Sequence, residues 1–255
     1  MKNAPTLRAC LYLFLSLFGM LLGSLFFAPL SSACHLFFVL LALLLEKGIS
    51  RGEGLPAFAK AGVKGKLRLL LLFPLFALFT LSANLLSAKL TLALGGTLPT
   101  VTPSFSLFLG AVLLAPLAEE LLFRGLLFRL FSRYGDRTAV LLSALLFAIA
   151  HGSMFQAPYA LIAGLLLGVL AVWSEGVLFP LLFHFAYNLL AFFGDGIPKV
   201  PLLLLLAGLA VLGVIFFLRS ERPPRFQRGE RLSFFPLLPL LLYALFPIAL
   251  AVLNF

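Results

Sequence analysis

The sequence has few charged residues and almost no cysteine. Charged residues make up 11% of its 255 positions, less than half of the roughly 25% that is typical of soluble domains. Both cysteines, Cys10 and Cys34, lie in apolar runs, and they provide neither a disulfide framework nor a metal-ligand spacing. The composition therefore excludes a soluble globular domain, and we interpret the cysteines as packing residues.

Hydrophobic residues instead fill 62% of the chain and gather in runs of about 20, the length with which a helix crosses a bilayer. Because helices satisfy their own backbone hydrogen bonds in lipid, we predict an all-α fold. It would be a polytopic transmembrane helical bundle, with one integral membrane domain over residues 1–255. Nine runs are candidates, and eight spans is the alternative because the second and fifth are short. The expected spans are Ala9–Ala28, Ser31–Leu45, Leu67–Leu86, Phe105–Phe131, Ala139–His151, Pro158–Trp173, Leu178–Phe193, Leu202–Leu218 and Phe234–Leu253.

Positive charges lie on alternate connections between these spans. All but three of the 19 lysines and arginines are at the N-terminus or in the second, fourth and eighth connections. The exceptions are Lys89, Lys199 and Arg124. Because positively charged loops stay in the cytoplasm, we expect a chain integral to the cytoplasmic membrane with a cytoplasmic N-terminus. The net charge of +10 is thus a topology signal. It indicates membrane lipid as a partner and does not indicate nucleic acid.

The fourth predicted span carries two carboxylates and a guanidinium, Glu119, Glu120 and Arg124. Ionisable groups at this depth are costly unless they are paired or hydrated, and they therefore indicate function. On a helix, residues four apart share a face, so we expect Arg124 to pair with Glu120 while Glu119 points about 100° away. Glu120 would then be a structural anion, and Glu119 would be free to act as a base.

Three further polar groups lie in apolar surroundings: His151 ends the fifth span, and His184 and Asn188 share a face of the seventh. At about 1.5 Å per residue, they reach a depth similar to that of Glu119. A carboxylate beside a neutral imidazole can deprotonate water, and an imidazole with a carboxamide can donate hydrogen bonds to an oxyanion. The set predicts attack of water on a carbonyl, most simply peptide hydrolysis. His35 matches no motif, and we interpret it as structural.

Three motifs follow one another on separate spans: Glu119-Glu120-x-x-x-Arg124, Phe147-x-x-x-His151 and His184-x-x-x-Asn188. In this order they resemble the motifs of the CAAX protease and bacteriocin-processing family, which includes the Ras-converting CAAX endopeptidases. The resemblance covers a core of about residues 103–193. It implies an intramembrane endopeptidase that cleaves near the C-terminus of a lipidated or membrane-associated peptide, within a helical bundle whose cavity opens toward the cytoplasm.

The resemblance also implies roles for the motif residues. Glu119 and His151 would activate the water, and His184 and Asn188 would form the oxyanion site. The supporting residues would be Glu120, Arg124 and Phe147. Two histidines and two glutamates can ligate zinc, but the chain has no H-E-x-x-H spacing. We therefore favour a site without metal or other cofactor.

Two other functions are compatible with the composition. A non-catalytic bacteriocin-immunity or membrane scaffold protein of the same fold would be expected to lose at least one motif residue, and none is missing. A proton-coupled transporter can also use Glu and His inside a bundle. It would be expected to show inverted repeats or broken helices in corresponding halves, and the sequence shows neither. A protease is therefore the favoured prediction.

Overall fold

The computed structural model describes residues 5–24, 28–50, 66–98, 102–153, 155–194, 196–220, 226–230 and 240. Within these residues the structure is helical, and the only β-type pairing is an isolated bridge between Gly135 and Arg228. The predicted all-α fold is confirmed.

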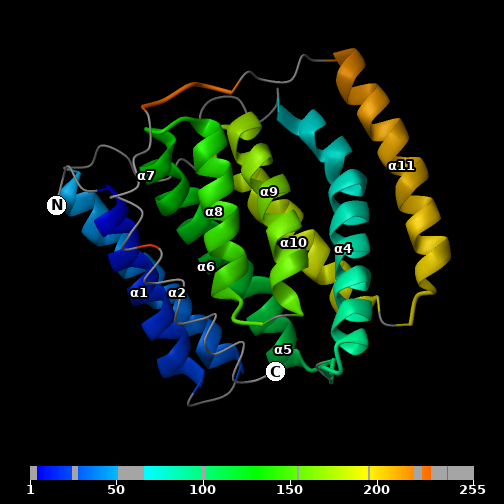
Figure 1. Ribbon diagram of the computed structural model, residues 1–255, viewed down its shortest axis with the longest axis horizontal. Helices are drawn as coiled ribbons and strands as arrows, with labels where there is room; N and C mark the ends of the chain where they lie inside the picture. The colour runs from blue at the N-terminus through cyan, green and yellow to red at the C-terminus, as the bar shows by residue number, and fades with distance from the viewer. Residues whose placement is uncertain are drawn as a thin grey trace.

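The described residues form eight helices, two of which are composed of consecutive segments (Figure 1). They are α1 (Pro5–Ser24), α2 (Ala28–Ile49), η1 with α4 (Leu67–Leu72 and Phe73–Ala93), α5 to α7 (Phe105–Ser132), α8 (Asp136–Ala150), α9 (Gln156–Ser174), α10 (Leu178–Phe193) and α11 (Lys199–Ser220).

Five of these helices are long and apolar enough to cross a membrane, and α1 and α10 are shorter apolar helices. The chain is therefore an integral membrane protein. The eight to nine predicted spans are somewhat more than the five long and two shorter apolar helices found among the described residues. The ninth, Phe234–Leu253, lies outside the described residues except for Leu240. The fifth span is short as expected, since α8 has 15 residues.

The second span is longer than the sequence predicted, because α2 continues through Glu46 to Ile49. The carboxylate of Glu46 is buried against α1, where Arg8 Nη1 donates to both of its oxygens at 3.0 and 3.2 Å. The hydroxyl of Tyr12 donates to the same carboxylate at 2.5 Å. This neutralised cluster lets a charged residue remain inside the helix, so the prediction of a short second span was wrong.

Successive helices run in opposite directions, so the connections gather at two ends of the bundle (Figure 1). We call the end where α7 meets α8 and where α11 finishes, uppermost in Figure 1, the basic end. The described lysines and arginines at this end are Arg8, Lys47, Lys66, Arg68, Arg129, Arg133, Arg137, Arg219 and Arg228. At the opposite end the described ones are Lys89 and Lys199. The alternation expected from the sequence is therefore present in the fold.

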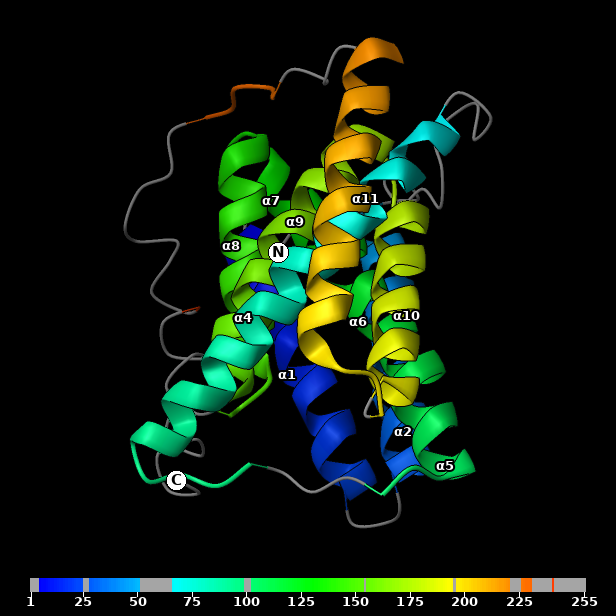
Figure 2. The same ribbon diagram turned by 90° about the vertical axis from the view of Figure 1, so that its right-hand side faces the viewer.

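Two hydrophobic clusters hold the bundle on either side of its centre. One joins α1 and α2 to the helix of α5–α7 and to α8, and Leu122, Leu127 and Phe131 are fully buried in it. The other joins α4, α9, α10 and α11, with α11 packed along α4 (Figure 2). The polar groups of the candidate site lie where these two clusters meet.

Close packing of α8 against α9 depends on two glycines. A Cβ on Gly164 would lie 3.0 Å from the Cα of Ala144, and one on Gly168 would lie 3.1 Å from a methyl of Val140. Small residues at this spacing let membrane helices approach backbone to backbone. This contact fixes the distance between the helix that ends in His151 and the helix that carries Gly164.

Candidate active site

The two adjacent carboxylates lie on a short α-helical segment between two widened turns. This segment, α6 (Ala115–Glu120), is preceded by the π-helix η2 (Phe108–Leu114) and followed by the π-helix η3 (Leu121–Leu127). Pro116 at its start has no N–H to donate. Widened turns of this kind occur frequently at functional sites.

Glu120 and Arg124 form a buried ion pair. Arg124 Nη1 donates to Glu120 Oε1 at 2.9 Å, and the exposed fractions of the two side chains are 1% or less. A second bond runs from Arg124 Nη2 to the carbonyl oxygen of Gly164 at 3.1 Å, and the guanidinium lies 4.5 Å from the centre of the Phe147 ring. The ion pair predicted from the spacing of four is confirmed, and it links the helix of α5–α7 to α8 and α9.

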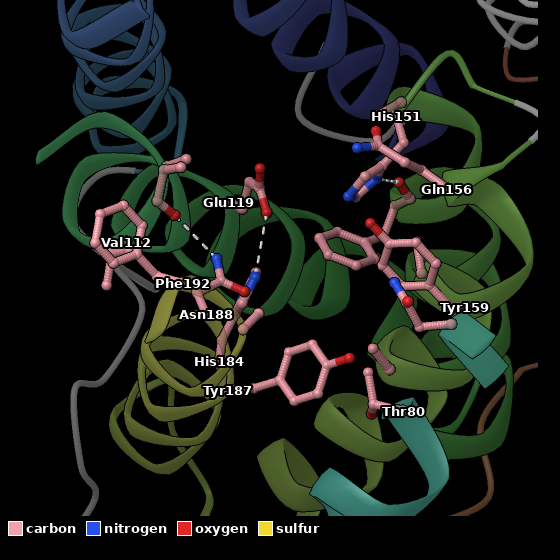
Figure 3. Close-up of a pocket in the computed structure, with 18 of the residues that line it drawn as sticks. Thr80, Val112, Glu119, His151, Gln156, Tyr159, His184, Tyr187, Asn188 and Phe192 are labelled. Atoms are coloured by element: carbon pink, nitrogen blue, oxygen red, sulfur yellow. Dashed lines mark hydrogen bonds and ion pairs between the residues drawn. The ribbon is translucent and has the colours of Figure 1, made fainter. Parts of the chain in front are cut away.

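His184 lies between the two carboxylates, as Figure 3 shows on the side of Glu119. Its Nδ1 is 2.8 Å from Oε1 of Glu120, the same oxygen that accepts from Arg124. Its Nε2 is 3.7 Å from Oε2 of Glu119. Because an ionised carboxylate only accepts, Nδ1 carries a hydrogen. The orientation of the ring is therefore fixed by Glu120.

The two carboxylates of this cluster have different surroundings. Glu120 is bonded to both Arg124 and His184 and is enclosed. Glu119 is 3.7 Å from His184 and is 19% exposed. The position of Glu120 is therefore fixed by its partners, and Glu119 is the more accessible carboxylate.

His151 has its tautomer set by its own helix. Nδ1 of its ring lies 2.8 Å from the carbonyl oxygen of Phe147. Because a carbonyl only accepts, Nδ1 donates and the neutral ring keeps a lone pair on Nε2. The Phe147 ring contacts His151 edge-on at 4.7 Å and His184 at 5.8 Å between centroids. Phe147 thus contacts both histidines and the guanidinium of Arg124.

Asn188 makes a contact that the sequence did not indicate. Its Nδ2 donates to the carbonyl oxygen of Ala111 at 2.9 Å. The N–H of Ala115 binds Gly110, and residue 116 is the proline, so neither of these backbone positions supplies Ala111 with a donor. Asn188 therefore satisfies a carbonyl in the widened turn, and its second amide hydrogen is left for another acceptor.

These residues line one cavity of about 650 Å³, into which Glu119, His151, His184 and Asn188 contribute side chains (Figure 3). Glu119 is 19% exposed there, whereas Glu120 is 1% exposed. The wall also includes polar side chains that belong to no motif. They are Ser16, His35, Thr80, Asn84, Gln156, Tyr159 and Tyr187.

His35, interpreted as structural from the sequence, lies on this wall. Its Nε2 is 2.8 Å from Ser16 Oγ, and both side chains are buried. The bond ties α2 to α1 at the edge of the cavity. A lone histidine in an apolar run carries no spacing signal, so sequence reasoning had no means of placing it there.

The cavity occupies the half of the bundle farther from the basic end. Its wall includes Pro103 and Leu107 where the helix of α5–α7 begins, Gln156 where α9 begins and Phe192 where α10 ends. We call this the cavity end, and it is the lower end in Figure 1. Because α1 begins at the basic end, the side of the membrane to which the cavity opens depends on which of the two ends faces the cytoplasm.

Metal ligands are not grouped in the part of the chain that the structure describes, where no set of three or more His, Cys, Asp and Glu side chains could hold an ion. Glu119 and His184 are close, but Glu120 and Arg124 bind each other.

Comparison with models of known protein families gives a match over the region that carries the motifs. Residues 100–190 match the family model of type II CAAX prenyl endopeptidase Rce1-like proteins. The matched segment includes all three motifs and less than half of the 255 residues, so α1, α2, α4 and α11 lie outside it. No curated protein and no solved structure matches the chain.

Proposed function

Because the chain carries an Rce1-like type II CAAX prenyl endopeptidase domain at residues 100–190, we propose that it is a membrane-embedded endopeptidase in which Glu119 activates water. The observation that carries the proposal is the inequality of the two adjacent carboxylates. Glu120 is buried and bonded to Arg124, whereas Glu119 faces the cavity and has an imidazole at 3.7 Å. A general base must be accessible to water and able to exchange a proton, and only Glu119 meets both conditions.

In the proposed reaction the water oxygen bonds to the carbonyl carbon, and its proton passes to Glu119. The lone pair on His151 Nε2 accepts a hydrogen bond from the same water. The carbonyl oxygen becomes an oxyanion, which receives a hydrogen bond from the second amide hydrogen of Asn188 and, when His184 is protonated at both ring nitrogens, a second one from His184 Nε2. When the carbon–nitrogen bond breaks, the proton held by Glu119 goes to the leaving amine.

The chemistry of the cavity wall supports a membrane-associated or lipidated peptide as substrate. Phe76, Phe155 and Phe192 provide apolar surface, and polar groups such as Tyr159 and Thr80 are spread between them. Cavities of this kind bury an apolar ligand and orient it with a few polar contacts. We propose cleavage near the C-terminus of such a peptide, by a site that needs no metal, in a membrane protein with a cytoplasmic N-terminus.

The test is cleavage of a fluorogenic farnesylated CAAX peptide by the purified full chain in detergent. Wild type is compared with Glu119→Gln and with Glu230→Gln. Glu230 is an exposed glutamate paired with Arg133 on the surface, so it serves as a matched carboxylate control. We expect cleavage by wild type and Glu230→Gln, with or without EDTA, and none by Glu119→Gln.

The other outcomes are informative in different ways. Loss of cleavage in EDTA with recovery in zinc would place Glu119 and the histidines in a metal site. Full activity of Glu119→Gln would reject the base assignment. Failure of wild type to cleave both the farnesylated peptide and a set of unmodified apolar peptides would reject the protease, and would support the non-catalytic immunity or scaffold role.

A further inference from the structure

We infer that the cavity opens to the non-cytoplasmic side of the membrane, and that the enzyme therefore acts on peptide segments at its outer face. The substrate part of this inference depends on the proposed protease function. The direction of opening does not, because it follows from the placement of charges and of empty space in the bundle.

The distribution of lysines and arginines between the two ends of the bundle indicates which end faces the cytoplasm. The described part of the basic end carries nine lysines and arginines, against Lys89 and Lys199 at the cavity end. At the basic end, the connection between α7 and α8 is short, with Arg133 inside it and Arg137 in the first turn of α8. Positive charge in short connections is what retains a loop in the cytoplasm. The basic end is therefore cytoplasmic, and the cavity end is on the opposite side.

The cavity extends from Glu119 toward the cavity end of the bundle. From Glu119 the cavity wall continues along one helix through Ala115 and Ala111 to Leu107 and Pro103, toward the cavity end. Pro103 is exposed. The wall is completed there by the beginning of α9 and the end of α10, and Figure 3 shows Gln156 and Phe192 at these places. The space thus extends from the site toward the non-cytoplasmic surface.

Buried side chains lie between Glu119 and the basic end. All seven residues of η3, Leu121–Leu127, are buried. Beyond them Phe131 and Ala139 have no exposed surface. Arg124 fills the centre of this half, where it binds Glu120 and Gly164. A small apolar pocket of about 110 Å³ lies in this half between α4, α9 and α10, but Glu119 does not line it. Water and peptide therefore reach Glu119 from the cavity end.

The charged residues of the cavity wall further limit the class of substrate that the cavity can bind. Among the described residues that line the cavity there is no lysine or arginine, and Glu119 is the only carboxylate. No fixed cation is therefore present to bind a free C-terminal carboxylate. The chemistry fits a neutral, apolar stretch of chain, such as the juxtamembrane part of an exported or membrane-anchored peptide.

The direction of opening can be measured without any activity by thiol labelling in spheroplasts of an expression host. Cys10 and Cys34 are first replaced by alanine. Two single cysteines are then compared: Ala191→Cys, an exposed position on the cavity wall, and Ser132→Cys in the last turn of α7 at the basic end. The reagent is a membrane-impermeant maleimide, applied before and after permeabilisation.

We expect Ala191→Cys to be labelled in intact spheroplasts to the extent seen after permeabilisation, and Ser132→Cys to be labelled only after permeabilisation. The reverse pattern would overturn the inference, since the cavity would then open to the cytoplasm. Absence of labelling at Ala191→Cys in both conditions would also overturn it, because the cavity would not be open to water.

A second measurement tests from which side of the membrane a peptide substrate is cleaved. Sealed right-side-out and inverted membrane vesicles receive the same membrane-impermeant peptide, and solubilised protein is assayed in parallel. We expect cleavage by right-side-out vesicles and loss of cleavage by inverted ones. Cleavage in detergent but not in right-side-out vesicles would reject outer-face access and keep the protease. Absence of cleavage in detergent would reject the protease, while the labelling result would still decide the direction of opening.

Discussion

The half of the bundle beside the basic end and the half beside the cavity end are built from the same helices, but they are packed differently. In the basic half, η3 is buried on all sides and Arg124 is bonded to two helices. In the cavity half, the same helix continues as η2, where Gly110 and Val112 are the buried residues. The change occurs between Glu120 and Glu119. The dense half fixes the positions of the polar groups, and the open half admits what they act on.

Neighbouring positions in the sequence can therefore have opposite physical roles. Glu120 shares one oxygen between Arg124 and His184 and is enclosed. Glu119, one residue earlier, has a single ion-pair distance of 3.7 Å to His184 and faces open space. Variants that separate these roles test the comparison directly.

The largest effect is expected for Glu119→Gln, which removes the proposed base and keeps the shape of the side chain. General-base catalysis contributes about 10²- to 10⁴-fold, so kcat/KM should fall by that order. The thermal midpoint in detergent should remain close to wild type, because Glu119 makes no short hydrogen bond to another described residue. A large drop in the midpoint would mean that Glu119 also holds the fold.

Arg124→Leu should have the opposite signature. Removing one partner of a buried ion pair costs about 3–5 kcal/mol, because Glu120 is left charged and enclosed. We expect a lowered thermal midpoint together with lost activity. Arg137→Leu, at an exposed arginine in the first turn of α8, is the control and should leave the midpoint unchanged. Equal shifts in the two variants would show that the Glu120 pair is not a stabilising centre.

Gly164→Val should loosen the dense half without touching a charge. A Cβ at this position would meet the backbone of Ala144 at 3.0 Å, and overpacking costs about 1–3 kcal/mol. Because the carbonyl of Gly164 accepts from Arg124, we expect both stability and activity to fall. Gly208→Val, where a Cβ would have nothing within 4 Å, is the matched control for thermal unfolding. A wild-type midpoint for Gly164→Val would contradict the close contact of α8 and α9.

Asn188→Ala should have the smallest effect. It removes one proposed oxyanion donor and leaves the carbonyl of Ala111 without its side-chain donor, which costs about 1–3 kcal/mol when a group is fully enclosed. We expect kcat to fall more than the thermal midpoint. Gln227→Ala, at an exposed amide that does not line the cavity, is the control and should change neither. If the two variants behave alike, Asn188 has no special role at the site.

Most of the helical architecture could be predicted from the sequence, because apolar runs and the length needed to cross a bilayer are local properties. The pairing of Glu120 with Arg124 was also predictable, since helix geometry places residues four apart side by side. The extent of α2 was not, because Glu46 remains helical only through contacts with Arg8 and Tyr12 on another helix. Local reasoning cannot see such a partner.

The site itself was predicted as a set of residues at one depth, and two features of it were not. The wall position of His35 depends on how α1 and α2 pack against the helix of α5–α7. The open side of the site depends on which half of the bundle is filled. A depth argument gives a level along the membrane normal, and it contains no information about the direction from which that level is reached.

The buried contact between Arg8 and Glu46 has a consequence for the biogenesis of the protein. A helix that entered the membrane alone would carry one of these charges without its partner, at a cost of several kcal/mol. Together, α1 and α2 form a hairpin whose charges cancel and whose Ser16 and His35 are bonded to each other. We therefore expect the two helices to insert as a pair, so that the first hairpin is assembled before the helices that carry the proposed catalytic groups leave the ribosome.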